Sequence, residues 1–143
     1  RSKEGKETEK DLIQKISMIN SLLADIENVE KTRLDNKKAK LLNEFNKLNI
    51  EIDQNRLEQE MIYYIEKFDI NEELIRLKSH IKLFMETLES KSPVGKKLGF
   101  ICQEIGREIN TIGSKSNDSS LQKYVIEMKD NLEKIKENIL NIL

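Results

Sequence analysis

The sequence predicts an all-α fold, with long antiparallel helical hairpins packed as a bundle of five or six helices. Charged residues make up 36% of the 143 residues, aromatic residues only 5%, and there is a single proline. This composition, rich in Lys, Glu, Leu and Ile, favours amphipathic helices over a sheet core. Apolar residues also recur at three- and four-residue spacing along most of the chain, which places them on one face of each helix.

The apolar stripes divide the chain into successive helices. We expect N-terminal helices over Leu12 to Ile26 and over Leu34 to Ile52, with a polar break near residues 49–55. A third stripe runs from Leu57 to Phe68, and Tyr64 lies on it, so a core position is favoured over base stacking. The break suggests an N-terminal helical segment, residues 1–55, that is truncated upstream and mediates oligomerisation, and a C-terminal helical domain, residues 56–143.

Short signals mark the later helix ends. Asp69-Ile70-Asn71-Glu72 has the form of a capping box, in which Asp69 accepts a hydrogen bond from the amide three residues on. Ser92-Pro93 is typical of an N-cap followed by a first-turn proline, and Gly113 of the residue just after a helix. We therefore expect a helix from near Pro93 to near Gly113, a loop to Asp118, and a last helix.

Composition limits the function. The net charge of −1 gives no global field for nucleic acid, so any RNA contact must come from a local basic strip. Cys102 is the only cysteine, which excludes an internal disulfide and a thiolate zinc cage; a buried apolar role is expected. Apolar runs are too short to span a membrane. We therefore expect a fragment of a longer, cytoplasmic protein.

Several segments together carry a family resemblance. They are Asp69–Leu74, Arg76–His80, Pro93–Leu98 and, most specific, Gln103–Asp118. With their order and spacing, the chain resembles the C-terminal region of the YicC-like endoribonucleases from Arg56 to Ile142. Three positions depart from the family pattern: Lys96 replaces a usual Arg, Gly99 a usual Asp and Gly106 a usual Asn.

The resemblance implies a metal-dependent endoribonuclease acting on single-stranded or small regulatory RNA. It also implies a homo-oligomer, by family a hexamer, and an N-terminal domain that this chain lacks. The competing hypothesis is a non-catalytic helical assembly or RNA-binding scaffold, which composition and periodicity alone would favour.

Two glutamates in the helix after Pro93 are candidate metal ligands. Glu104 and Glu108 lie one turn apart, and their like charges repel unless a cation joins them. Mn²⁺ or Mg²⁺ is one such cation, since both prefer carboxylate oxygens. An Arg or Lys from a neighbouring helix is the other, and the sequence leaves both open.

The helix after Asp69 repeats the arrangement. His80, the only histidine, can act as an acid–base near neutral pH, or it can be an ordinary half-buried residue. The predicted catalytic residues are His80, Glu73, Glu104 and Glu108, converging on one cleft. The predicted RNA-binding residues are Arg76, Lys97, Arg107 and Lys115. The run Lys37-Lys38-Ala39-Lys40 is less specific and is interpreted as a solvated helix face.

Overall fold

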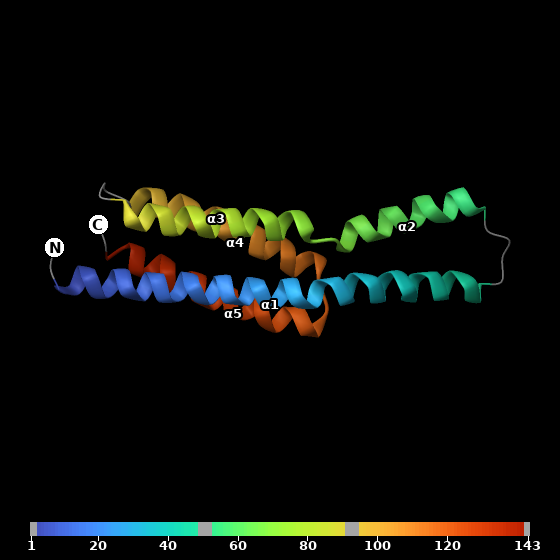
Figure 1. Cartoon of the computed structure of the whole chain (residues 1–143), viewed down its shortest axis with the longest axis horizontal. Coiled ribbons are helices and arrows are strands. Elements are labelled where there is room, and N and C mark those ends of the chain that lie inside the picture. Colours follow the sequence, from blue (N-terminus) through green and yellow to red (C-terminus); the bar gives the residue numbers. More distant parts are fainter. Residues whose placement is uncertain (1–2, 49–52, 91–94, 142–143) are drawn as a thin grey trace.

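The computed structural model describes residues 3–48, 53–90 and 95–141. They form the helices α1 (Lys3–Lys47), α2 (Gln54–Phe68), α3 (Asn71–Glu89), α4 (Gly95–Lys115) and α5 (Ser119–Ile139). None of the described residues lies in a strand, so the predicted all-α class is confirmed (Figure 1).

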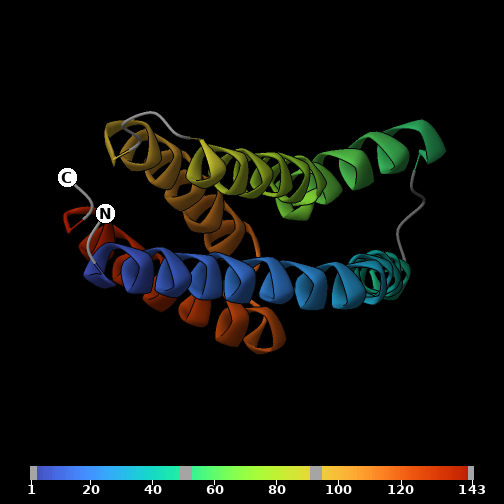
Figure 2. The same cartoon turned by 60° about the vertical axis from the view of Figure 1, so that its left-hand side comes forward.

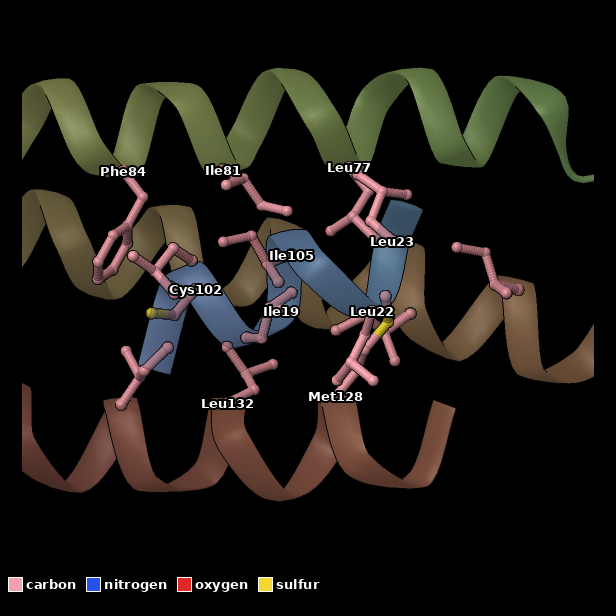
Figure 3. Close-up of a cluster of buried hydrophobic side chains, with 14 of the residues drawn as sticks. Ile19, Leu22, Leu23, Leu77, Ile81, Phe84, Cys102, Ile105, Met128 and Leu132 are labelled. Atoms are coloured by element: carbon pink, nitrogen blue, oxygen red, sulfur yellow. The ribbon is translucent and has the colours of Figure 1, made fainter. Parts of the chain in front are cut away.

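Helices α1, α3, α4 and α5 pack into a bundle around one apolar core. Helix α1 contacts α5 and α3, and α4 contacts both α3 and α5. In Figure 3, Leu23, Leu77, Ile105 and Leu132, one from each helix, point into the shared interior. All four side chains are buried. The described bundle therefore has four helices instead of the predicted five or six, because α2 stays outside it.

Helix α1 is one continuous helix of 45 residues, about 67 Å long at 1.5 Å per residue. Our prediction of a boundary between helices over Leu12–Ile26 and Leu34–Ile52 is wrong, because residues 27–33 contain no glycine or proline to interrupt a helix. Residues 49–52, where the second helix and the polar break were predicted to meet, lie outside the described residues. The first stripe, from Leu12 to Ile26, is buried inside the bundle. This stripe therefore contributes to the bundle core, while Ile13 and Met18 in the same segment stay exposed.

The second half of α1 and helix α2 form a hairpin, which we call the arm (residues 34–47 and 54–68). Figures 1 and 2 show the arm extending beyond the ends of α4 and α5. No residue of α2 is buried. Tyr64 is 36% exposed, so its predicted core position is wrong. The reason is that α2 contacts α1 but receives no second covering helix.

The end of α2 differs from the predicted capping box. The Asp69 carboxylate accepts a hydrogen bond from the amide of Asn71, two residues on, at 2.9 Å, and α3 begins at Asn71. Ile70 takes the N-cap position, where no side chain caps the helix. Asp69 thus forms a local turn between α2 and α3 in place of the expected cap.

Helix α4 ends two residues later than predicted. Gly113 lies inside the helix, where an added Cβ would approach Val125 Cγ1 to 3.2 Å. The glycine therefore permits close packing of α4 on α5. The Gln122 side chain caps the helix end by donating to the carbonyls of Gly113 and Ser116. At the other end α4 begins at Gly95, and Ser92-Pro93 lies outside the described residues.

Two further sequence predictions can be compared with the structure. Cys102 is buried in the core, as expected (Figure 3). Burial raises the pKa of its thiol from 9.0 to about 12, against a smaller lowering by Lys136. Among the described helices, none is both long and apolar enough to cross a membrane.

Candidate active site

A buried glutamate is the centre of the candidate site. Glu73 lies in the first turn of α3, and its side chain is 4% exposed. Its Oε1 accepts a hydrogen bond from Lys115 Nζ at 2.8 Å, across to the last turn of α4. Lys115 also donates to the carbonyl of Asp69 at 3.3 Å. One ammonium group therefore joins the end of α4 to both the α2–α3 turn and the start of α3.

A second ion pair joins the same two helices. Arg76 Nε contacts both carboxylate oxygens of Glu108, at 2.8 and 3.1 Å. Glu108 is buried, whereas the Arg76 side chain is 47% exposed. Arg76 also approaches Glu73 Oε1 to 3.6 Å and Glu72 to 3.4 Å. The hydrogen bond that Arg76 donates to Glu108, more than its attraction to Glu72 and Glu73, raises the pKa of Arg76 above its ordinary value.

These residues, Glu73, Arg76, Glu108 and Lys115, form what we call the cross-helix cluster. It borders a polar cavity of about 410 Å³, whose lining includes Glu72, Glu73 and Lys115. Glu73 Oε2 is buried and has no hydrogen-bond partner among the described residues. Buried polar atoms in native proteins are nearly always paired, so this oxygen keeps an unused capacity to accept a hydrogen bond.

The structure thus brings together four of the predicted site residues. Glu104 stands apart from the cross-helix cluster in its contacts: its side chain is 48% exposed and pairs with Arg107 at 3.8 Å. Glu104 lies one turn from Glu108, and His80 one turn from Arg76, on the same helix faces. Because α3 and α4 run antiparallel, Glu104 and His80 both lie on the side of the Arg76–Glu108 pair that faces away from Lys115. His80 is half-buried.

Lys97 is separated from the rest of the predicted site. It is exposed in the first turn of α4, whereas Lys115 is in the last turn. Their separation of 18 positions corresponds to about 27 Å of helix. Lys97 and Lys115 therefore cannot contact the same phosphate.

Sequence reasoning missed a second charged cluster, at the junction of the arm and the bundle. Arg33, with a side chain 5% exposed, donates to Glu30 at 2.7 and 2.9 Å, to Asp118 at 3.3 Å and to the Phe68 carbonyl. Burial lowers the pKa of Arg33, but the hydrogen bonds of Glu30 and Asp118 outweigh it and leave the pKa raised. Lys37 reaches the same Asp118 at 3.5 Å.

A signal for this junction was present in the sequence. Glu30 and Arg33 continue the spacing of the buried stripe after Leu23 and Ile26, so two charged residues occupy positions that face inward. Charged residues at inward positions of a helix are rarely buried unless they are paired. The pairing partner, Asp118, is 85 residues further along the chain, which no local pattern reveals.

Comparison with known proteins adds a family assignment. The family model described as "Endoribonuclease YicC-like, C-terminal" matches residues 26–143. A "Probable endoribonuclease YicC" of Clostridioides difficile (strain 630) is 38% identical over 145 residues, covering 99% of this chain and 50% of that protein. A protein of the same name from Haemophilus influenzae is 34% identical over 143 residues, covering 96% and 49%. The chain thus spans about half the length of these curated relatives.

Proposed function

The chain belongs to the YicC-like endoribonuclease family, and from this premise we propose that it supplies catalytic residues for the cleavage of RNA phosphodiester bonds. The observation that carries the proposal is the cross-helix cluster, with the unpartnered, buried Glu73 Oε2 beside a polar cavity. A helical scaffold would gain nothing from leaving a buried carboxylate oxygen without a partner, since doing so costs stability.

The two cations of the cluster are suited to bind a phosphate. Arg76 and Lys115 are positioned by buried carboxylates, yet their side chains remain 47% and 32% exposed. Charge-assisted hydrogen bonds from such groups stabilise the negative charge that develops on a phosphorane. In the proposed reaction, Arg76 and Lys115 hold the phosphate oxygens while the adjacent ribose 2′ hydroxyl attacks phosphorus.

The remaining roles concern the two protons of this reaction. Glu73 Oε2 accepts the proton of the attacking 2′ hydroxyl, and a protonated His80 donates a proton to the leaving 5′ oxygen. His80 suits this role because histidine is the side chain most often used for general acid–base catalysis, and it is half-buried, one turn from Arg76. The products are a 2′,3′-cyclic phosphate and a free 5′ hydroxyl.

Divalent metal dependence is a separate part of the proposal. Mn²⁺ or Mg²⁺ would be held by Glu104 and Glu108, with phosphate oxygens and water completing the shell, as is common for Mg²⁺. Within the described ranges, no three or more His, Cys, Asp or Glu side chains come together as a metal site. Glu108 is also already bound by Arg76. A metal at Glu104 and Glu108 would have to displace Arg76, and the roles above are therefore assigned to side chains alone.

Self-association completes the proposal. The resemblance implies a homo-oligomer, and the arm exposes apolar side chains that the bundle does not cover, among them Leu42, Ile62 and Tyr63. Exposed apolar side chains favour contact with another protein surface. Sedimentation of the full-length protein at micromolar concentration should give a species larger than a monomer.

The catalytic proposal can be tested with labelled single-stranded RNA. Glu73→Gln and His80→Ala in the full-length protein should each slow cleavage on the order of 10²–10⁴-fold, because each removes an acid–base group. Helicity should not change. The matched control is Glu133→Gln, an exposed glutamate on α5. Wild-type rates in both Glu73→Gln and His80→Ala would leave the scaffold hypothesis standing.

Metal dependence needs its own comparison. Cleavage by the full-length protein is measured with Mn²⁺, with Mg²⁺ and with EDTA. If Glu104 and Glu108 bind the metal, EDTA stops the reaction, and Glu104→Gln and Glu108→Gln abolish cleavage and weaken Mn²⁺ binding in calorimetry. Unchanged cleavage in EDTA would exclude the metal while leaving the roles of Glu73 and His80 intact.

A further inference from the structure

The arm contains a groove that the cleavage proposal does not use. It lies between the second half of α1 and helix α2, and its volume is about 240 Å³. Pockets that enclose drug-sized ligands measure roughly 300–1,000 Å³. This groove is therefore of a size for one flat ring system.

The groove combines aromatic rings with basic side chains. Tyr64 and Phe68 line it from α2, and Lys37, Lys38 and Lys40 line it from α1. Lys37 Nζ lies 4.3 Å from the centre of the Phe68 ring. Lys38, Lys40 and Tyr64 are exposed. Proteins bind single-stranded RNA with this pair of features: rings on which bases stack, and cations that contact the backbone phosphates.

From these observations we propose that the groove is a subsite for single-stranded RNA, in which one base stacks on Tyr64 and the flanking phosphates contact Lys38 and Lys40. The inference rests on the proposed function, because it assumes an RNA substrate. It adds a binding site separate from the cross-helix cluster.

Charge favours RNA over a second copy of this chain. Glu44 is the one acidic residue among those that line the groove, against three lysines. A symmetric contact between two arms would bring the lysines of one groove against those of the other, and like charges at close range repel. Phosphates neutralise the same lysines.

The position of the groove connects it with the cluster. Phe68, at one end of the groove, directly precedes Asp69, whose carbonyl accepts the hydrogen bond from Lys115. Arg33 holds the Phe68 carbonyl, and Lys37 contacts both the Phe68 ring and Asp118. A strand whose base occupies the groove would leave it at the α2–α3 turn, toward the polar cavity beside Glu73.

The test measures binding without cleavage. The probe is a fluorescein-labelled, single-stranded RNA in which every 2′ hydroxyl is methylated, titrated with the full-length protein. The variants are Lys38→Gln/Lys40→Gln and Tyr64→Ala. The matched controls are Lys129→Gln/Lys134→Gln, which removes two exposed lysines of α5, and Tyr64→Phe, which keeps the ring.

We expect Tyr64→Ala to weaken binding roughly 5- to 150-fold, the effect of losing one stacked base, and Tyr64→Phe to bind like the wild type. Lys38→Gln/Lys40→Gln should reduce the slope of log affinity against log salt by about 1.4, for two lost phosphate contacts on a single strand. The α5 double variant should retain the wild-type slope.

Different failures lead to different conclusions. Wild-type affinity and salt slope in the groove variants, with RNA still cleaved, would overturn the subsite and leave the proposed function standing. A groove variant that loses self-association but keeps its RNA affinity would also overturn the subsite, because the groove would then hold a second copy of this chain. A wild-type protein that neither binds nor cleaves RNA would reject both proposals.

Discussion

The bundle and the arm use the same kind of amphipathic helix with different results. In the bundle, each apolar stripe faces two neighbours, and side chains such as Leu23 and Ile105 are fully buried. In the arm, α2 faces α1 alone and buries no residue. The difference shows that a stripe reveals which face of a helix is apolar, while the number of neighbouring helices decides whether that face becomes core.

The largest expected effect on stability comes from truncating a core residue, compared with truncating a residue of the arm. Phe84→Ala should lower the free energy of unfolding by about 3–5 kcal/mol, because Phe84 is fully buried and its removal leaves a cavity. Ile65→Ala, in the half-buried face of the arm, should lower it by less than about 1 kcal/mol. Urea unfolding followed by circular dichroism measures both, and equal losses would erase the distinction between the two regions.

The junction between the regions should give the next largest effect. Arg33→Met leaves Glu30, Asp118 and the Phe68 carbonyl without their shared donor, at a cost of about 1–3 kcal/mol. Amide hydrogen exchange should also become faster at the α2–α3 turn than within α5. If amide exchange became faster evenly over the whole chain, Arg33 would not specifically stabilise the junction between the arm and the bundle.

Alkaline pH should weaken the bundle through Cys102. Its thiol stays protonated in the folded protein to a pKa of about 12, whereas the unfolded chain loses this proton near 9.0. Between these pH values the unfolded state binds fewer protons, so the free energy of unfolding falls as pH rises, by up to about 1.4 kcal/mol per pH unit. Cys102→Ala removes this contribution, so its free energy of unfolding should decline less steeply with pH than that of the wild type. Parallel curves of unfolding free energy against pH for the two proteins would refute a contribution from Cys102.

Glycines of α4 should show the smallest effects. At Gly99 an added Cβ meets no atom within 4 Å, so Gly99→Ala should stabilise the bundle by about 0.5–1 kcal/mol through helix propensity. Gly113→Ala places a Cβ 3.2 Å from Val125 Cγ1, so it should stabilise the bundle less than Gly99→Ala does, or destabilise it. Thermal unfolding of the two variants gives the comparison, and an equal gain at both sites would mean that α5 accommodates the methyl group.

Part of the candidate site was visible in the sequence. Glu73, Arg76, Glu108 and Lys115 lie at the margins of apolar stripes, and the antiparallel packing of α3 on α4 brings them into contact. The pairing itself was not predictable, because a helical period gives the face of a residue but not its register against another helix. Arg33 and Asp118 were missed for the same reason: they meet only after α1 and the α4–α5 loop pack together.

By itself, the sequence determined that this chain is helical, which faces are apolar and that Cys102 is buried, because these follow from local propensity and from a period of 3.6 residues. Tertiary structure alone decided that the second half of α1 leaves the bundle as part of the arm and that α2 stays uncovered. It also decided that Lys115 reaches Glu73, 42 residues away along the chain. These features depend on where helices end relative to one another, which side-chain spacing within a single helix does not specify.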